Sequence, residues 1–266
     1  MRIPARTLLN TAEIELWPAW LLRARANGDA RILSRASRVL RRKCDGRYLA
    51  AVLPEGLMPL VPRLAREAGV DEALDLLDGA PAANALDAGT LPLHRLAERL
   101  DALGLEAEAY ANDCGLELVA EPVALTLAGF DRYRRPLWLS ADAARAWQRM
   151  RETAGRDGVA LEAISGYRSH DYQLGIFERK RARGLGLAQI LEVNAAPGFS
   201  EHHSGDALDI GTPGEPPAEE SFEATPAFDW LQRHAGASGF AMSYPRGNPH
   251  GIVYEPWHWR YLRADG

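Results

Sequence analysis

The 266-residue sequence predicts an α+β fold, with a small, mainly antiparallel sheet flanked by helices and a mostly helical N-terminal region. From residue 121 onward, helix and strand patterns alternate, and the last strand patterns lie close together in sequence, which favours antiparallel pairing. Residues 1–120 are rich in Ala, Leu and Arg, which favour helices. We therefore expect an N-terminal accessory region over 1–120 and a functional domain over 121–266.

Within the first region, leucine spacing supports the helical expectation. Four leucines follow one another at spacings of three, four and three, which places them on one helical face: Leu93, Leu96, Leu100 and Leu103. Residues 116–120 alternate in character and predict a short strand. This region shows no residue pattern that indicates chemistry, so we expect it to pack against the second region or to shape its substrate site.

The second region opens with a capped helix. Ser140 is a suitable N-cap for a helix over 141–153, because its hydroxyl can accept from a free amide of the first turn. The elements that follow are a buried strand over 159–164, a turn over 165–169, a helix over 171–183 and a short helix over 187–191.

The last third of the chain supplies the rest of the sheet. We expect a strand over 207–210 and then a helix over 226–235, where Thr225 caps the first turn and Pro226 occupies its first position. Two further strands are expected over 240–244 and 251–254.

Charge and composition exclude several classes of function. The formal net charge is −5, whereas a phosphate-binding surface needs clustered Lys and Arg, so no nucleic-acid partner is expected. Cys44 and Cys114 are far apart and form no metal-binding pattern. No stretch has the ~20 apolar residues of a membrane span, and polar residues interrupt any secretory core after Met1. We therefore expect a cytoplasmic protein, or an exported one if a leader has been removed; the oligomeric state stays open.

One segment combines two histidines with two acids. His202 and Asp209 stand seven residues apart, with a Ser204-Gly205 break that can bring both side chains to one point. Catalytic zinc commonly takes three protein ligands from His, Asp and Glu and leaves a fourth position for water. On a strand, Asp209 faces away from Leu208 and Ile210, so it can face a cleft while those two pack in the core.

A second segment, residues 254–261, places an acid three residues before a histidine among aromatic side chains. His258 is the candidate third ligand. Glu255 could then reach the attacking water, accept its proton and return that proton to the leaving amine. Each segment alone is ambiguous, because a single histidine is more often structural. Together they indicate one zinc ion bound by His202, Asp209 and His258.

Four separated segments carry a specific resemblance. Residues 165–169 (SGYRS), 198–202 (GFSEH), 205–209 (GDALD) and 255–258 (EPWH) are similar to the D-alanyl-D-alanine carboxypeptidases, including the vancomycin-resistance type. That family belongs to the lysostaphin, D-Ala-D-Ala peptidase and hedgehog fold group. The resemblance covers residues 121–266 and none of the first 120.

The resemblance implies a role for each matching residue. His202, Asp209 and His258 would bind zinc, Glu255 would be the catalytic base and acid, and Arg168 would hold the substrate's free carboxylate. A guanidinium suits that role because it grips a carboxylate through two parallel hydrogen bonds. Further candidates for substrate contact or pocket walls are Ser204, Gln173, Trp257 and Tyr167. Asp206 departs from the family, and we expect it to face solvent or the substrate.

The resemblance leaves the scissile bond open. We expect an L,D-carboxypeptidase that removes D-alanine from peptidoglycan tetrapeptides during wall recycling, because no signal sequence is visible. The alternative is a D,D-carboxypeptidase acting on D-Ala-D-Ala pentapeptides. An alternative from another class is a non-catalytic, zinc-containing protein that binds peptidoglycan peptides. The pairing of Glu255 with Arg168 favours catalysis, since a structural zinc site needs no acid facing water.

Overall fold

The computed structural model describes residues 5–24, 26–79 and 89–263. The chain forms two compact units: Met1–His94 with Pro122–Leu127, and Arg95–Glu121 with Ala128–Gly266. These units divide the chain at points other than residue 120, because residues 95–121 group with the second unit. Across the described ranges, no helix combines the length and the apolar character that crossing a membrane requires.

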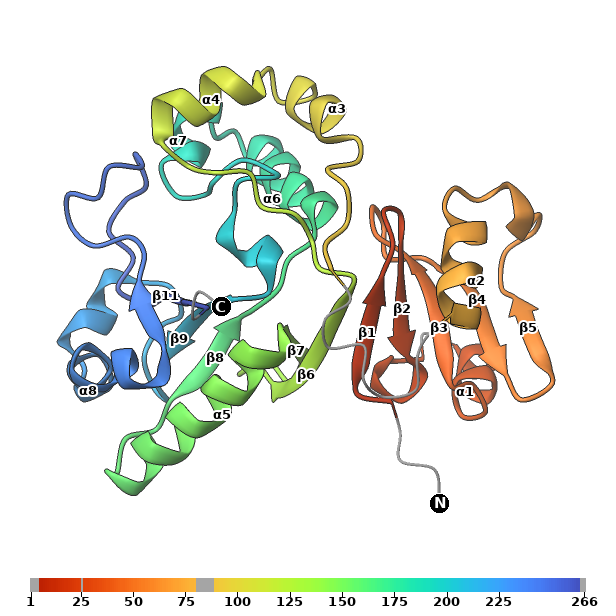
Figure 1. Cartoon of the computed structure of the whole chain (residues 1–266), viewed down its shortest axis with the longest axis horizontal. Coiled ribbons are helices and arrows are strands. Elements are labelled where there is room, and N and C mark those ends of the chain that lie inside the picture. The colour runs from red at the N-terminus through yellow and green to blue at the C-terminus, as the bar shows by residue number, and fades with distance from the viewer. Residues whose placement is uncertain (1–4, 25, 80–88, 264–266) are drawn as a thin grey trace. The chain divides into compact units, whose positions relative to one another are not determined.

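The first unit contains an antiparallel sheet in the order β5-β4-β3-β2-β1-β6; Figure 1 draws β1 to β5 in red to orange and β6 in yellow-green. Five of its strands follow one another along the chain, and β6 joins the edge formed by β1. The strands are β1 (Thr7–Asn10), β2 (Ile14–Pro18), β3 (Arg38–Arg42), β4 (Tyr48–Leu53), β5 (Gly56–Pro59) and β6 (Ala124–Phe130). Beyond residue 127, β6 runs into the second unit, where it neighbours β7 (Pro136–Leu139).

Both faces of this sheet are covered. On β3, Leu40 packs into a cluster with α2 (Val70–Gly79), whereas its neighbour Val39 packs on the other face beside α1 (Asn27–Leu33). Short 3-10 turns, η1 (Ala19–Leu21) and η2 (Leu64–Arg66), connect these elements. Because Val39 and Leu40 pack on opposite faces, a slip of β3 by one residue would exchange these two faces.

The expectation of a mostly helical N-terminal region is wrong for residues 7–59, which contain five strands and only one α-helix, α1, although the α+β class is confirmed. Ala, Leu and Arg have high intrinsic helix propensity, but packing on two faces overrides propensity here. Gly46, at φ +69°, closes the turn between β3 and β4, where a side chain would be strained.

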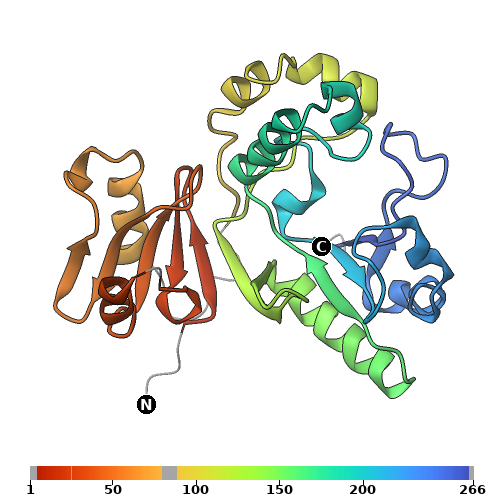
Figure 2. The ribbon, with the colours of Figure 1, turned by 180° about the vertical axis from the view of Figure 1, so that it is seen from behind.

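The second unit is built around a four-stranded antiparallel sheet in the order β10-β11-β9-β8 (Figure 2). Its strands come from distant parts of the chain: β8 (Glu162–Ser165), β9 (Ala207–Gly211), β10 (Phe240–Met242) and β11 (His258–Tyr261). The central strand β9 therefore has neighbours from both sides of it in sequence. It carries Asp209, one of the predicted ligands.

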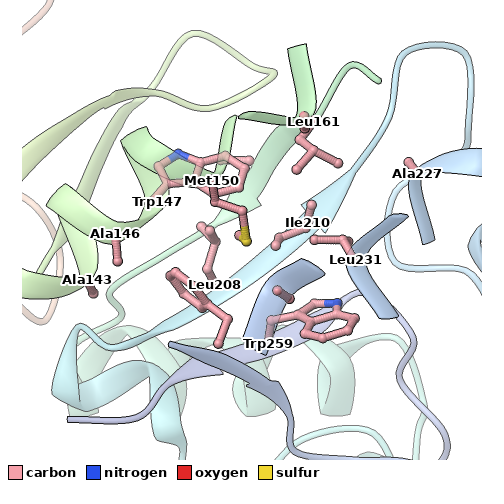
Figure 3. Packing of buried hydrophobic residues seen from close by; sticks show 14 of the residues in the cluster. Ala143, Ala146, Trp147, Met150, Leu161, Leu208, Ile210, Ala227, Leu231 and Trp259 are labelled. Carbon is pink, nitrogen blue, oxygen red and sulfur yellow. The ribbon is translucent and has the colours of Figure 1, made fainter. Parts of the chain in front are cut away.

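One face of this sheet packs against α5 (Ala141–Arg156) and α8 (Pro226–His234). In Figure 3, Leu208 and Ile210 of β9 lie among Trp147 and Met150 of α5 and Leu231 of α8. The predicted caps are confirmed, since the hydroxyls of Ser140 and Thr225 accept from the first turns of these two helices. The 3-10 turns η5 (Glu220–Ala224) and η6 (Ala235–Ser238) flank α8.

The remaining helices of this unit gather at its other end (Figures 1 and 2). They are α3 (Leu96–Asp101), α4 (Ala107–Cys114), α6 (His170–Ala182) and α7 (Leu187–Leu191). Leu103, Phe177 and Ile190 form one shared apolar cluster, and a buried ion pair of 2.8 Å joins Arg99 Nε to Asp171 Oδ1. The leucine stripe is confirmed from Leu96 to Leu103, whereas Leu93 is exposed.

Two expected strands are absent from the described residues. Residues 116–120 form no strand; instead, the Val119 amide donates to the carbonyl of Gly198 at 2.7 Å. Residues 251–254 are also irregular, and the last strand is β11, which begins at His258. Local alternation could not reveal that β11 would pair with β9, since that pairing depends on residues about fifty positions away.

Candidate metal and peptidase site

Two neighbouring strands carry two of the predicted ligands. Asp209 and His258 are direct partners in the antiparallel register of β9 and β11. Residues on either side of them point into the core, including Leu208 and Trp259, so Asp209 and His258 share the opposite face. Asp209 Oδ1 lies 3.1 Å from His258 Nδ1.

His202 reaches the same point from the short turn η4 (Glu201–Ser204). Gly205 ends this turn at φ +74°, and the chain then enters β9. His202 Nδ1 lies 2.7 Å from the carbonyl oxygen of Gly166, so Nδ1 donates and Nε2 keeps its lone pair. A Cβ atom on Gly166 would lie 2.8 Å from the carbonyl oxygen of Trp138, so glycine permits this close approach.

The three residues offer a geometry that fits a metal ion. One potential ligand atom from each of His202, Asp209 and His258 lies within 4.8 Å of the other two. Asp209 Oδ1 is 3.3 Å from His202 Nε2, close to the separation of about 3.3 Å expected between ligands about 2.0–2.1 Å from a tetrahedral zinc ion. The buried His202 Nε2 has no hydrogen-bond partner among the described residues, which is what a nitrogen reserved for a metal requires.

Glu201 adds a carboxylate behind the third ligand. Its Oε2 lies 2.8 Å from His258 Nε2, while its Oε1 lies 3.2 Å from Arg260 Nη1. A carboxylate bonded to the second ring nitrogen orients a metal-binding histidine and makes it more basic. The sequence interpretation did not give Glu201 a role, because no local pattern shows that it would meet a residue 57 positions later.

The two histidine ligands differ in pKa. Burial lowers the pKa of His202 to about 4, so this ring is neutral at pH 7. Burial would also lower the pKa of His258, but the hydrogen bonds that its ring donates to Asp209 and Glu201 raise it to about 10. Burial opposes ionisation of Asp209, yet its pairing with His202 and His258 holds the pKa of that carboxyl well below its usual range. Without a metal, His258 therefore supplies the positive charge between two carboxylates.

Glu255 is held beside the ligands by its backbone. Its amide donates to the carbonyl of Tyr244 at 3.0 Å, and its Oε2 lies 3.9 Å from His258 Nδ1. Burial is the main cause that raises the pKa of Glu255 to about 7, although His258 opposes the shift. A carboxyl with a pKa near the working pH can both accept and return a proton.

The ligands and Glu255 line one cleft of about 360 Å³ within the second unit. Arg168, Gln173 and Trp257, which the sequence predicted as substrate-binding residues, line it too. The sequence interpretation missed further lining residues, among them Lys180, Asn194, Ser200 and Tyr244. Tyr244 packs 4.9 Å from the His258 ring between centroids, and the segment around it gave no motif.

A buried histidine holds the backbone of Arg168 in place. His203 Nδ1 donates to the carbonyl of Arg168 at 2.6 Å, and its Nε2 accepts from the amide of Gly198 at 3.1 Å. The Arg168 amide in turn donates to the carbonyl of His202 at 3.1 Å. The turn that carries Arg168 is thus tied directly to the segment that carries the first ligand.

The other predicted contacts lie in different places. Gln173 is buried, and its Nε2 donates to the carbonyl of Ala195 at 2.8 Å. Its Oε1 has no hydrogen-bond partner among the described residues. The Ser204 hydroxyl donates to the carbonyl of Glu201 at 2.6 Å, within its own turn. Tyr167 donates to Glu121 Oε2 at 2.6 Å. Neither Ser204 nor Tyr167 is among the described residues that line the cleft.

The expected position of Asp206 is wrong. It was expected to face solvent or the substrate, but it is only 4% exposed. It accepts a short hydrogen bond from the Ser140 hydroxyl, and its Oδ2 lies 2.9 Å from Arg263 Nε. A buried carboxylate requires such partners, so Asp206 ties the end of the chain to the first turn of α5.

Comparisons with known proteins find relatives among carboxypeptidases. The family model described as VanY, D-alanyl-D-alanine carboxypeptidase, matches residues 136–264. YodJ of Bacillus subtilis (strain 168) is 36% identical over 137 residues, which cover 50% of each protein. The bifunctional D-Ala-D-Ala dipeptidase and D-Ala-D-Ala carboxypeptidase VanXYC of Enterococcus gallinarum is 31% identical over 147 residues, 53% of this chain and 75% of that protein.

A solved structure of the LdcB LD-carboxypeptidase is 33% identical at a TM-score of 0.49, covering 53% of this chain and 69% of that one. The match spans half the length of YodJ and three quarters of VanXYC. The family model covers residues 136–264, which contain the cleft and the predicted ligands. By its family match and its likeness to VanXYC, the chain belongs to the D-alanyl-D-alanine carboxypeptidase family of vancomycin-resistance type.

Proposed function

We propose that this protein is a zinc-dependent carboxypeptidase that removes a C-terminal D-alanine from peptidoglycan stem peptides. The observation that carries the proposal is the convergence of three potential metal ligands, Glu255 and Arg168 on one cleft. Family membership supports the chemistry. The substrate is inferred from the names of VanXYC and other relatives described as D-alanyl-D-alanine carboxypeptidases.

The donor set supports zinc as the metal. Two imidazole nitrogens and one carboxylate oxygen match the ligands of catalytic zinc sites, which leave a further position open. A zinc ion held by His202, Asp209 and His258 would polarise the scissile carbonyl group and make a water molecule more acidic. Glu201 would keep the His258 ring oriented by accepting its Nε2 proton.

Glu255 supplies the proton transfer. In its ionised form, the Glu255 carboxylate accepts a proton from the water that attacks the scissile carbonyl. It then donates that proton to the amine of the departing D-alanine. The walls around Glu255, which include Tyr244 and Trp257, keep bulk water from solvating the carboxylate and account for its raised pKa.

Arg168 makes the enzyme an exopeptidase in this proposal. The guanidinium lines the cleft, and its buried Nε has no hydrogen-bond partner in the part of the chain that the structure describes. A terminal carboxylate would complete that unmet donor. An endopeptidase substrate offers no free carboxylate at this point, so Arg168 argues against cleavage of internal bonds.

The stereochemistry of the scissile bond is the finer part of the proposal. The names of the relatives divide between the two bonds: VanXYC is described as a D-Ala-D-Ala carboxypeptidase, whereas LdcB is described as an LD-carboxypeptidase. Our sequence-based expectation was the L,D bond of a tetrapeptide. Both bonds place D-alanine on the leaving side and its carboxylate toward Arg168. The two activities therefore use the same groups in the same roles.

Mass spectrometry of defined stem peptides tests the proposal. Tetrapeptides and pentapeptides would be incubated with the zinc-loaded protein, with and without a chelator, beside an E255A variant. Chelator-sensitive loss of one alanine supports the proposal, and the peptide that is shortened identifies the bond. Zinc binding and peptide binding without any cleavage would instead support the non-catalytic alternative.

A further inference from the structure

A second cation lines the cleft. Lys180 lies on α6 seven residues after Gln173, which places both side chains on the same helical face. Phe177, between them, is fully buried and anchors that face of α6. The helix therefore presents an amide and an ammonium group to the cleft that also contains Arg168.

Lys180 and Arg168 both lack an anionic partner within the described residues. No carboxylate there lies within ion-pair distance of either side chain, and Arg168 Nε is also without a hydrogen bond. Other cations of α6 differ: the Arg179 guanidinium stacks over Tyr172, and Arg181 donates to the carbonyls of Ala102 and Leu103. Arg179 and Arg181 thus engage neighbours outside the cleft, whereas Lys180 and Arg168 line the cleft.

The two cations also influence each other. Burial lowers the pKa of Lys180, and Arg168 lowers it further, with a larger effect than the opposing one of Glu255. Two like charges in a half-buried cleft cost free energy unless an anion binds between them. Together with the Glu255 carboxylate, the pair carries one surplus positive charge, which a single carboxylate neutralises.

We propose that Lys180 and Arg168 jointly bind the terminal carboxylate of the substrate, with Lys180 as a second substrate-binding cation. This inference rests on the proposed carboxypeptidase function. Arg168 would bind the carboxylate through its planar fork, whereas Lys180 would add a mobile point charge that tolerates small shifts of the carboxylate. Lys180 is thus a determinant of exopeptidase specificity.

Binding of peptides that are not cut tests this proposal directly. In a zinc-loaded E255A background, calorimetry would compare diacetyl-L-lysyl-D-alanyl-D-alanine with its C-terminal amide. The free acid has its carboxylate only at the C-terminus. We expect K180M to raise the Kd of the free acid about tenfold, in line with loss of a charge-assisted contact, and to leave the Kd of the amide unchanged.

Two controls separate charge from structure. K180R retains the charge and should restore most of the affinity for the free acid. R179M removes an exposed charge from the same helix and should change neither Kd. If K180M binds acid and amide as its parent does, the proposal is wrong.

A third peptide distinguishes another source of a carboxylate. L-alanyl-γ-D-glutamyl-L-lysyl-D-alanyl-D-alanine carries an additional carboxylate on its D-glutamate. An effect of K180M confined to this peptide would overturn the proposal, because Lys180 would then recognise the D-glutamate. Failure of the parent protein to bind any of these peptides, or the tetrapeptide L-alanyl-γ-D-glutamyl-L-lysyl-D-alanine, would instead remove the proposed function itself.

Discussion

Asp209 and His258 stand opposite each other on β9 and β11, and their side chains meet at 3.1 Å on the face of the sheet that lines the cleft. The antiparallel register fixes this pair, while His202 joins it from the turn before β9. The backbone pairing of two strands therefore builds two thirds of the ligand set before any metal binds.

Replacing His258 should remove the metal. We expect His258→Ala to abolish stoichiometric zinc binding, since two ligands without the third bind weakly. It should also destabilise the fold by about 3–5 kcal/mol, because Asp209 and Glu201 lose the cation between them. Elemental analysis and thermal unfolding measure the two effects. His258→Gln, which keeps a donor toward Glu201, should lose zinc with less destabilisation, and the exposed His234→Ala should do neither.

Replacing Glu255 should separate chemistry from metal binding. Glu255→Ala should retain one zinc per chain but lose at least ~100-fold in kcat, the low end for general acid–base catalysis. Steady-state kinetics on the shortened peptide, together with zinc analysis, gives both values. A variant with near-normal kcat would contradict the role given to Glu255.

The raised pKa of Glu255 predicts the acid side of the pH–rate profile. The base must be ionised, so kcat/KM should fall as pH decreases through its pKa. Burial raises that pKa to about 7 in the metal-free protein, and the positive charge of a bound zinc ion should move it back toward the ordinary value of 4.5. The midpoint of the acid limb should therefore lie between these two values. A profile that stays flat down to pH 4.5 would exclude Glu255 as the titrating base.

Glu201 should contribute to metal affinity without binding the metal. Glu201→Gln weakens the acceptor of the His258 Nε2 proton, and such changes behind a ligand typically cost 10–100-fold in metal affinity. Competition with a chromogenic chelator would measure the zinc Kd. Glu178→Gln, an exposed change on α6, serves as the matched control. Equal zinc affinity in the two variants would show that Glu201 does not support His258.

Zinc binding should release at least one proton per site at about pH 8.5, because His258 must lose its proton to bind the metal. His258 has its pKa raised to about 10 and is still protonated there, whereas His202, with a pKa of about 4, is already neutral. Zinc affinity should therefore increase as pH rises toward 10 and decrease as pH falls. Calorimetry in two buffers with different ionisation enthalpies counts the released protons. Release of none would mean that His258 is neutral before zinc binds.

Local sequence was sufficient for the parts of the site that depend on spacing. One turn and the start of one strand separate His202 from Asp209, and Glu255 stands three residues before His258. Their placement on one cleft could therefore be predicted. The helices α5, α6 and α8 were also predictable, because Ser140, Ser169 and Thr225 cap them through their own side chains.

Contacts between distant residues could not be predicted in the same way. Glu201 meets His258 only because β11 pairs with β9, and Lys180 lines the cleft only because Phe177 fixes the rotation of α6. The strands of residues 7–59 could not be predicted for a related reason. Its strands are stabilised by packing on both faces, which is a property of the assembled sheet rather than of any single segment.

Gly198 should be required for the fold around the first ligand. It has φ +89°, and a Cβ atom there would lie 2.4 Å from Leu96 Cδ1. Its amide also donates to His203, which holds the Arg168 turn. We expect Gly198→Ala to lose about 1–2 kcal/mol of unfolding free energy from the left-handed conformation and a further amount from displacing Leu96.

Gly184→Ala is the matched control for this prediction. Gly184 has a similar φ of +90°, but a Cβ atom there would meet nothing within 4 Å. Both variants incur the conformational cost, so the difference in their unfolding free energies isolates the clash with Leu96. Only Gly198→Ala should also weaken peptide binding, because it displaces the segment that positions His203 and Arg168. Equal stability and equal peptide affinity in the two variants would show that the contact between Leu96 and the Gly198 loop does not position the site.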